Sequence, residues 1–501
     1  MTITIDEIND IIKQAFDEAE KSLSVGDYQR AKNLYEQILR VSPDTDAAHL
    51  LSLVLHKLNE NEASLNILNQ YFHETDNWEI RNTFGVVLSS LNRHELAIEH
   101  LELAEKCTTK PEIVYNNIAL AHRGLLNHDI EKKYLLKALN SNSTIPYLWF
   151  NLANAEMELG NSKAAIKSYQ KAIDLEPDNA SYHWNLANAY LSVGEYEKGW
   201  EEYEWRWKQF HAFDAIRQRF NKPLWQGEDL NNKTILLYCE QGAGDTVQFL
   251  RYISLLKSKG ARVIFEWPIQ SIRGDLTNLL WSFSDIDMVV DDDEVFNTEF
   301  DYHQSIMSLP FVMKTYSMLK TEPYIQPIEP ELSPVLSEHL WESYKNKFKI
   351  GCVNAGSRLH PNDHIRSFDM SVFKVVEQLP NIQLFNLQKD HFPRKWKDGW
   401  IDLSDESLNI VDLSHYLFDF NSTAHAINQL DLILTVDTAV AHLAGAMGKN
   451  CILMVSHNPD WRWHQSQWYG SNFVIFKKAH WRQSWDELMI DVSNYIKKEY
   501  L

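Results

Sequence analysis

The chain has 501 residues, of which 44% are hydrophobic and 12% aromatic, enough for several domains with buried cores. Its formal net charge of −21 argues against a nucleic-acid partner, because a phosphate backbone is bound through an excess of Lys and Arg. The acidic, polar segment 1–12 is unlike a secretory signal, and no stretch approaches the roughly 20 apolar residues of a membrane-spanning helix. We therefore expect a cytoplasmic protein with no stable membrane insertion.

Segment 1–210 carries an internal repeat. Asn151 matches Asn185 and Gly160 matches Gly194 at a period of 34 residues, which is typical of tetratricopeptide repeats. Weaker copies in the same phase precede them and predict about six helix pairs stacked as a right-handed α-solenoid. Such an array presents a concave binding surface, and we expect no catalysis from it.

Asparagine recurs at one position of these repeats, in Asn117, Asn151 and Asn185. An amide side chain donates and accepts hydrogen bonds at once, so a row of them can hold an extended polypeptide. The row resembles the asparagine-lined repeats of the protein O-GlcNAc transferases. The alternative is that these amides bridge neighbouring helices, since asparagine is a frequent consensus residue in such repeats.

An aromatic segment, KGWEEYEWRWKQF, follows the last repeat and ends at residue 210. Trp200, Tyr203 and Trp207 fall on one helical face, so we predict a capping helix of the solenoid whose aromatic face is buried against the next domain. The polar stretch 211–230 is predicted to be the linker to the next domain.

The stretch EQGAGDTVQFLRY lies between the apolar strand KTILLYC and an amphipathic helix. Gly242 and Gly244 allow the backbone to turn tightly and to approach a ligand, and Thr246 is predicted to open the helix. Asp245 is thereby placed at the carboxyl edge of a parallel sheet, where α/β enzymes hold their chemistry. The alternative is a tight connection in which Asp245 only caps the helix.

A second strand, turn and helix are predicted for LDLILTVDTAVAHLAGAMG. Asp437 and Thr438 end the apolar strand, and the N–H groups of Ala439 and Val440 then point out of a helix N-terminus, a favourable site for an anion. His442 lies in the first helical turn, where its imidazole can contact the same anion. The alternative is that Asp437 caps the helix and His442 is a hydrogen-bonded surface residue.

These motifs belong to two predicted Rossmann-like domains. The first covers residues 231–330 and the second residues 331–501, with the proline-rich region 323–334 between them. Two parallel-sheet domains joined in this way form a cleft between the carboxyl edges of their strands. The predicted fold is therefore an α-solenoid followed by two α/β domains that face a cleft.

The same motifs resemble the GT-B glycosyltransferases of the ADP-heptose:lipopolysaccharide heptosyltransferase class, in the branch with N-terminal tetratricopeptide repeats. The resemblance covers most of the chain and rests on EQGAGDTVQFLRY, FDYHQSIMSLP, LFNLQKD, VDTAVAHLAGAMG and PDWRWH. The branch usually has a WxGNP-type run where this chain has CVNAGSRLHPNDHIRSF, of which only the later part fits. The resemblance implies a GT-B fold and an inverting transferase that needs no metal and no cofactor besides its nucleotide-sugar substrate.

The resemblance also implies roles for particular residues. Asp245, on the acceptor side, is the candidate general base, and the second domain holds the nucleotide-sugar. The expected donor-binding residues are Arg358, Arg366, Gln388, Lys389, Asp437, Thr438, Ala439, Val440, His442, Trp461 and Arg462. The expected acceptor or loop residues are Gln241, Gly242, Gly244, Thr246 and Gln248, together with Asn117, Asn151 and Asn185 on the repeats.

We therefore predict an inverting, metal-independent glycosyltransferase that modifies a protein acceptor recruited by the repeats, and the resemblance brings flagellin into consideration. The donor stays open among a CMP-nonulosonate, an ADP-heptose and a UDP-hexosamine. One alternative is a heptosyltransferase-type enzyme with a lipid-linked or glycan acceptor. The other is a repeat scaffold without catalytic activity.

Overall fold

The computed structural model describes residues 5–72, 75–268, 275–316, 322–328, 338–357, 360, 363–389, 394–396, 399–401, 408–464 and 468–501. Arg358, one of the expected donor-binding residues, lies outside the described residues. The chain divides into two compact units, residues 1–182 and 183–501, and each is considered by itself.

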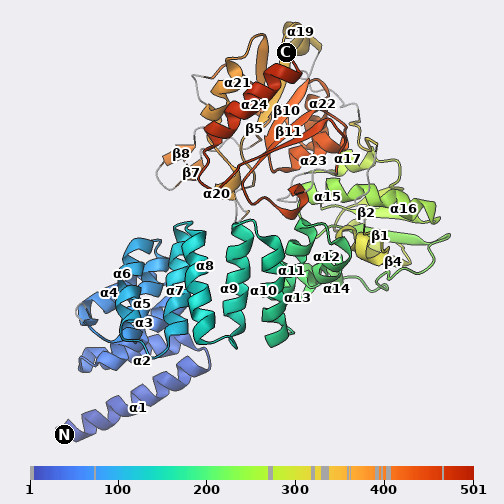
Figure 1. Cartoon of the computed structure of the whole chain (residues 1–501). Helices are drawn as coiled ribbons and strands as arrows, with labels where there is room; N and C mark the ends of the chain where they lie inside the picture. Colours follow the sequence, from blue (N-terminus) through green and yellow to red (C-terminus); the bar gives the residue numbers. More distant parts are fainter. Residues whose placement is uncertain are drawn as a thin grey trace. The chain divides into compact units, whose positions relative to one another are not determined.

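The first unit consists of helices that pack in the order of the sequence (Figure 1). Small side chains stand where the helices approach each other, and Ala31, Ala97 and Ala153 are fully buried. The helical repeat region predicted from the sequence is therefore confirmed. Its helices are α1 (Ile5–Ser24), α2 (Tyr28–Val41), α3 (Thr45–Lys57), α4 (Asn61–Phe72), α5 (Trp78–Ser90), α6 (His94–Glu105), α7 (Pro111–Gly124), α8 (His128–Ser141), α9 (Pro146–Glu158) and α10 (Ser162–Leu175), and α11 (Ala180–Ser192) runs on into the second unit.

The repeat is also visible in the backbone between paired helices. A residue with positive φ recurs there at intervals of 33 or 34 residues: Gly26, Asn59, Asn92, Leu126, Gly160 and Gly194. Glycine and asparagine adopt this left-handed conformation at little steric cost, whereas Leu126, with φ of +58°, does so against its side chain. The turn between paired helices therefore has the same backbone geometry in the copies that have no glycine at this position.

The second unit contains two parallel sheets. The first has the order β3-β2-β1-β4 and the second the order β12-β11-β10-β5-β6-β9. The first sheet is formed by β1 (Thr234–Tyr238), β2 (Arg262–Glu266), β3 (Met288–Val290) and β4 (Tyr302–Ser305). The second is formed by β5 (Phe348–Val353), β6 (Ile382–Asn386), β9 (Ile410–Asp412), β10 (Leu432–Val436), β11 (Cys451–Val455) and β12 (Phe473–Lys477). A short antiparallel pair joins β7 (Arg394–Trp396) to β8 (Gly399–Ile401).

Helices connect and cover these strands (Figure 1). Those before and around the first sheet are α12 (Tyr196–Tyr203), α13 (Arg206–Gln209), α14 (His211–Gln218), α15 (Ala243–Phe249), α16 (Ile253–Ser258), α17 (Thr277–Trp281) and α18 (Leu309–Val312). Those around the second sheet are α19 (Glu338–Ser343), α20 (Asp363–Arg366), α21 (Lys374–Glu377), α22 (Phe420–Asn428), α23 (Ala439–Ala446) and α24 (Trp485–Glu499). The C-terminal α/β architecture expected from the sequence is thus present.

Each sheet contains a point where the chain reverses the direction in which it adds strands. In the first sheet this point lies between β1 and β4, and in the second between β5 and β10. Parallel sheets bind ligands in the crevice that opens at such points, at the carboxyl ends of the strands. The two strand-turn-helix motifs singled out in the sequence follow β1 and β10, so both lie at a switch point.

The aromatic segment predicted to cap the solenoid belongs instead to the second unit. Trp200 and Tyr203 are each 1% exposed and share a hydrophobic core with the strand residue Ile235. The boundary therefore falls earlier than the predicted residue 210, because this aromatic surface packs against the α/β fold. The predicted linker 211–230 holds α14, and Leu224 forms a parallel β-bridge to His303.

Candidate functional site

The turns after β1 and β10 lie against each other. Gly244, in the first turn of α15, packs so closely that a Cβ atom on it would stand 3.2 Å from Cα of Ala439 and 3.0 Å from Cδ2 of His442. Both of these residues belong to the first turn of α23. The absence of a side chain at Gly244 thus allows the N-terminal ends of two helices to meet, and it brings the two predicted loops into one site.

Asp245 is held in place through both carboxylate oxygens. Its Oδ2 accepts a hydrogen bond from the backbone N–H of Gly242 at 3.0 Å, which makes it part of the N-terminal cap of α15. Its Oδ1 accepts from Nη2 of Arg462 at 2.6 Å. The helix begins at Ala243 and not at the predicted Thr246. Because the Asp245 side chain is 22% exposed and each oxygen can accept a second hydrogen bond, a hydroxyl group can still reach it.

Arg462 connects the two halves of the site. Beyond Asp245, its Nε donates to Oε1 of Gln248 at 2.9 Å and its Nη1 to Oδ1 of Asp460 at 2.8 Å. The Arg462 side chain is only 9% exposed. The charges of Asp460 and Asp245 hold the pKa of Arg462 above its usual range against the opposing effect of burial, so it stays a cation.

Asp437 follows β10 and is partly buried. Burial, reinforced by the negative charge of Asp460, raises the pKa of Asp437 to about 6, while Arg366, Trp463 and Arg462 act in the opposite direction. Arg366 thus lies close enough to interact electrostatically with the Asp437 carboxylate. It also packs across Gly356 in the turn after β5, and its Nε stands 3.7 Å from Oδ1 of Asp363.

His442 is 4% exposed and is not the surface histidine considered as an alternative. Its Nδ1 is 2.9 Å from the hydroxyl oxygen of Tyr469, and its ring lies 4.8 Å from that of Trp463. Burial and the positive charges of Arg462 and Arg251 lower the pKa of His442 well below its usual value. A neutral imidazole packed in this way braces the start of α23.

Two expected donor residues lie in the turn after β6. Gln388 is 7% exposed and its Oε1 accepts from the N–H of Ala355 at 3.3 Å, which ties this turn to the one after β5. Lys389 is exposed and its Nζ donates to the carbonyl oxygen of Phe418 at 2.6 Å. Both residues brace loops at the carboxyl edge of the second sheet in this structure, and their binding roles remain predictions.

The tryptophans of PDWRWH are packed side chains. Trp461 is 4% exposed and meets Trp200 edge to face at 5.4 Å, and Trp463 is 3% exposed and stacks on Phe473 at 5.7 Å. The burial of both favours a structural contribution for Trp461, the expected stacking partner of the donor.

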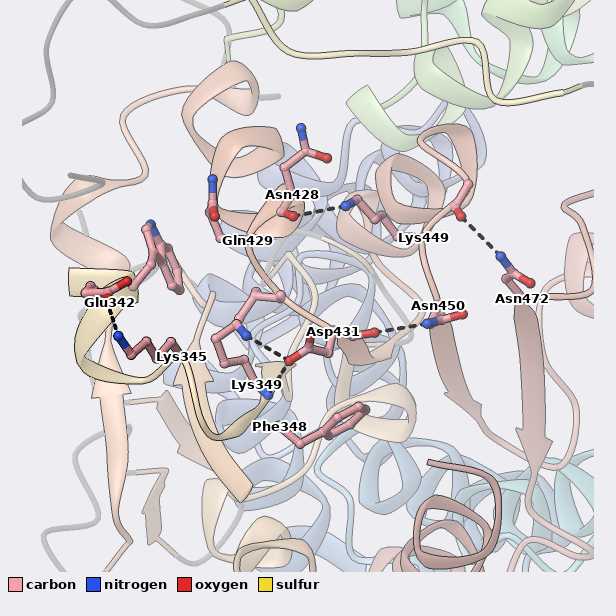
Figure 2. A pocket seen from close by; sticks show the side chains of 13 residues that line it. Glu342, Lys345, Phe348, Lys349, Asn428, Gln429, Asp431, Lys449, Asn450 and Asn472 are labelled. Carbon is pink, nitrogen blue, oxygen red and sulfur yellow. Dashed lines mark hydrogen bonds and ion pairs between the residues drawn. The ribbon is translucent and has the colours of Figure 1, made fainter. Parts of the chain in front are cut away.

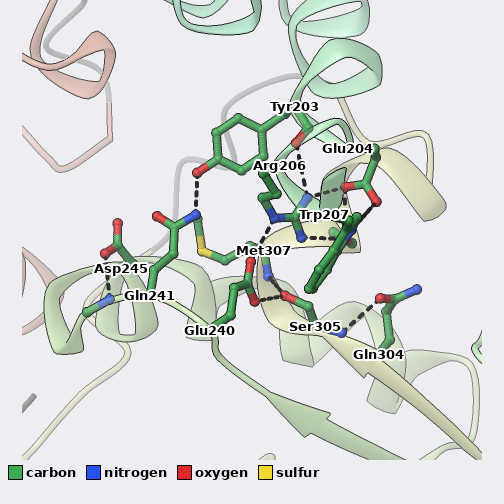
Figure 3. Close-up of polar contacts among 12 residues, drawn as sticks. Tyr203, Glu204, Arg206, Trp207, Glu240, Gln241, Asp245, Gln304, Ser305 and Met307 are labelled. Carbon is green, nitrogen blue, oxygen red and sulfur yellow. Dashed lines mark hydrogen bonds and ion pairs between the residues drawn. The ribbon is translucent and has the colours of Figure 1, made fainter. Parts of the chain in front are cut away.

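A buried ion pair next to the loop was missed by sequence reasoning (Figure 3). Arg206 is fully buried and its Nε donates to Oε1 of Glu240 at 2.7 Å, while Nη2 donates to Oγ of Ser308 at 2.6 Å. The adjacent Gln241 donates through Nε2 to the hydroxyl oxygen of Tyr203 at 2.7 Å. The Glu in EQGAGD was the available signal, since a charged residue directly after an apolar strand needs a buried partner.

The repeat asparagines bridge neighbouring helices, as the alternative interpretation expected. Nδ2 of Asn117 donates to Oδ1 of Asn82 at 2.7 Å, and Nδ2 of Asn151 donates to Oδ1 of Asn116 at 2.8 Å. Asn185 occupies the equivalent place on α11. Asn117, Asn151 and Asn185 are all partly exposed, so the predicted contact with a polypeptide stays a prediction.

A cavity of about 1170 Å³ lies at the opposite edge of the second sheet (Figure 2). Its lining includes Lys349 at the start of β5, Asp431 just before β10 and Lys449 shortly before β11. These groups satisfy one another: Nζ of Lys349 pairs with Asp431 at 3.0 Å, and Nζ of Lys449 donates to the carbonyl oxygen of Asn428 at 3.0 Å. The cavity is therefore separate from the switch-point loops.

Comparison with known proteins identifies the repeats. A family model for the TPR repeat matches residues 153–194, which confirms tetratricopeptide repeats in the chain. Protein FlbA of Caulobacter vibrioides is 22% identical over 474 residues, covering 89% of this chain and 77% of FlbA. Among solved structures, a thermophilic TPR protein of Thermus thermophilus shares 20% identity, with a TM-score of 0.33 over 36% of this chain and 99% of its own. PilF of Pseudomonas aeruginosa shares 18% identity, with a TM-score of 0.36 over 42% of this chain and 98% of its own. Within the described residues, no helix combines the length and apolarity that crossing a membrane requires.

Proposed function

We propose that the second unit is an inverting glycosyltransferase that moves a sugar from a nucleotide-sugar to a protein acceptor recruited by the repeats, without a metal ion. The observation that carries this proposal is the meeting of the two switch-point turns, where the residue before Asp245, Gly244, packs against the first turn of α23. Inversion needs these two elements on opposite sides of one sugar: a general base for the acceptor hydroxyl and a stabiliser for the departing phosphate.

The proposed roles follow from the position of each group. Asp245 takes the proton of the acceptor hydroxyl. The N–H groups at the start of α23 and the guanidinium of Arg366 meet the charge that develops on the leaving nucleotide. Asp437 directly precedes Thr438, the N-cap of that helix, and is influenced by the charge of Arg366; it would orient the nucleotide through its hydroxyl groups. The donor remains open among a CMP-nonulosonate, an ADP-heptose and a UDP-hexosamine, and the GT-B fold belongs to the same proposal.

The acceptor is proposed to be a protein because tetratricopeptide repeats commonly hold polypeptides. Flagellin is one acceptor of this class that the sequence resemblance suggests. An acceptor that is a lipid-linked or free glycan would leave the repeats without a part in recognition. Replacing Asn117, Asn151 and Asn185 together by Ala separates the two, since it should weaken modification of a protein acceptor and leave a glycan acceptor unaffected.

A repeat scaffold without activity is the second candidate, and one observation favours it. Asp245 caps α15 and pairs with Arg462, which is what a purely structural carboxylate would do. Two observations favour the transferase: Asp245 stays partly exposed, and the adjacent Gly244 packs against the first turn of α23.

The test is to screen the full chain against ADP-, UDP-, GDP- and CMP-sugars by thermal shift. A donor at a hundred times its Kd should add about 2.7 kcal/mol of stability. Transfer to protein from the native cytoplasm is then followed by mass spectrometry, with and without EDTA. We expect Asp245→Asn to lower transfer by roughly 10²–10⁴ while the thermal shift persists, and EDTA to leave transfer intact.

The exposed Asp292, replaced by Asn, is the matched control for loss of a carboxylate. No thermal shift with any of the four donor classes would reject the nucleotide-sugar proposal. Normal transfer by Asp245→Asn would remove Asp245 from the mechanism. Loss of transfer in EDTA that Mg²⁺ or Mn²⁺ restores would reject the metal-independent reaction.

A further inference from the structure

The hydrogen bonds of Arg462 hold other side chains, among them Asp245, in place. All three of its donating nitrogens are directed to protein acceptors: Nε to Gln248, Nη1 to Asp460 and Nη2 to Asp245. Gln248 and Asp245 lie on α15, whereas Asp460 precedes the short helix η6 (Trp461–Trp463), which lies between β11 and β12 of the second sheet. Arg462 therefore ties the loop of the first sheet to a segment of the second.

The surroundings of Arg462 fix this arrangement. Its guanidinium lies 4.5 Å from the ring centre of Trp461, and that ring is itself packed edge to face against Trp200. The Asp460 side chain, which also accepts from the N–H of Arg462 at 3.0 Å, holds the base of the arginine. A planar guanidinium with three directed donors restricts its acceptors in a way that a single ammonium cannot.

A cation that neutralises a leaving phosphate needs donors directed at the phosphate. Arg462 is 9% exposed, and three of its five N–H groups donate to the side chains of Gln248, Asp460 and Asp245, which leaves two N–H groups on a nearly buried guanidinium. The burial and these three bonds disfavour the donor-binding role expected from the sequence for Arg462.

We propose that Arg462 is a positioning residue that orients the Asp245 carboxylate, and that it does not bind the donor. This inference rests on the proposed function for the role of Asp245 as base. Its structural part, the orientation of Asp245, stands on the three hydrogen bonds alone. Gln248 is a second positioning residue. It lies one turn further along α15 than Asp245, and its side chain accepts the hydrogen bond from Nε of Arg462.

The first test needs no substrate. Amide hydrogen exchange is measured on the full chain for peptides spanning residues 240–252. Arg462→Gln should speed exchange in this segment, because the contact that ties it to the second sheet is lost. Arg462→Gln in an Asp245→Asn background should add little further, since both changes remove the same contact. The exposed Arg482, replaced by Gln, is the control for the loss of one positive charge.

The second test uses two variants of Arg462 and the release of nucleotide from the nucleotide-sugar that stabilises the wild-type chain. Arg462→Lys keeps the charge but cannot direct three hydrogen bonds, so kcat should fall on the order of 10²-fold while KM for the donor changes little. Arg462→Gln also removes the charge, so kcat should fall at least as far as in Arg462→Lys, again with little change in KM for the donor.

The outcomes separate the two proposals. Faster exchange at 240–252 together with a kcat loss at constant KM supports the positioning role. Unchanged exchange in Arg462→Gln overturns it. A rise in KM for the donor at unchanged kcat in either Arg462 variant also overturns it. If no nucleotide-sugar binds the wild-type chain, the proposed function fails, and the exchange result still decides whether Arg462 orients Asp245.

Discussion

The two compact units are stabilised by polar contacts of different range. In the repeats, the hydrogen bond from Asn117 to Asn82 joins residues 35 apart, and so links neighbouring repeats. In the second unit, Arg206 reaches Ser308 across 102 residues and Arg462 reaches Asp245 across 217. A repeat array divides its stability among neighbours, whereas these long-range contacts tie several strands and loops into one cooperative structure. Substitutions should therefore act locally in the first unit and across the whole fold in the second.

The largest effect is expected from Arg206→Ala. It leaves Glu240 buried without its main partner, which should lower the free energy of unfolding of the second unit by about 3–5 kcal/mol. The control is Arg93→Ala, which breaks an exposed ion pair between repeats with Glu62 and should cost no more than about 1 kcal/mol. Urea unfolding monitored for both variants checks the contrast. Similar losses from the two changes would contradict it.

The next effect is a pH dependence that originates at Asp437. Its folded pKa of about 6 lies above the usual 3.8, so between these values the folded chain binds more protons than the unfolded chain. The stability of the wild-type chain should therefore fall as pH rises from about 4 to about 6, by up to about 3 kcal/mol for this group. Asp437→Asn should remove this slope. Melting temperatures of the wild-type chain and of Asp437→Asn are measured across this pH range. A parallel change in the two proteins would exclude the effect.

A smaller effect is expected where α15 and α23 meet. Gly244→Ala places a methyl group 3.2 Å from the backbone of Ala439, so the helices must separate, at a cost of about 1–3 kcal/mol. Gly470→Ala is the matched control, because a Cβ there has no neighbour within 4 Å. Donor binding should weaken in the first variant only. Equal stability of the two variants would mean that the loops are not closely packed.

The smallest effect belongs to the first unit. Leu126 has φ of +58° and is 42% exposed, so Leu126→Gly should relieve strain and stabilise the repeats by about 1 kcal/mol. Leu136, on α8 and 44% exposed, should respond to glycine with a loss of about 1 kcal/mol, because a helical position disfavours glycine. Thermal unfolding of the two variants should thus shift in opposite directions. A loss in both would show that Leu126 is not strained.

The comparison also explains what the sequence could predict. The period of 34 residues identified the repeats, because each copy contacts only its neighbours and repeats the same spacing. The turns at Asp245 and Asp437 were predicted for a related reason: strand, glycine or small turn and helix are adjacent in the chain. What lies across the fold was not predicted. The contact of Arg462 with Asp245 and the burial of Arg206 against Glu240 join distant segments, and no spacing in the sequence signals them.

The boundary of the units shows the same limit. A stripe of Trp200, Tyr203 and Trp207 predicts a buried helical face, and these side chains are buried. Because the segment precedes the next domain, the sequence also predicts that this domain covers the face, but it does not identify the residues that do so. Trp200 packs on Phe249 of α15 and on Trp461, so the segment belongs with the α/β fold. Contacts of this kind require the tertiary arrangement.

The central claim is that a nucleotide-sugar binds in the second unit at the N-terminus of α23, and one substitution there tests it directly. Thr438 is the N-cap of α23 and is partly exposed. Asp and Asn are both favoured caps of similar shape, but only Thr438→Asp adds a negative charge where the donor phosphate is proposed to lie. Titration calorimetry with the nucleotide-sugar that stabilises the wild-type chain should show at least about tenfold weaker binding for Thr438→Asp than for Thr438→Asn. Equal affinity of these two folded variants would contradict the account.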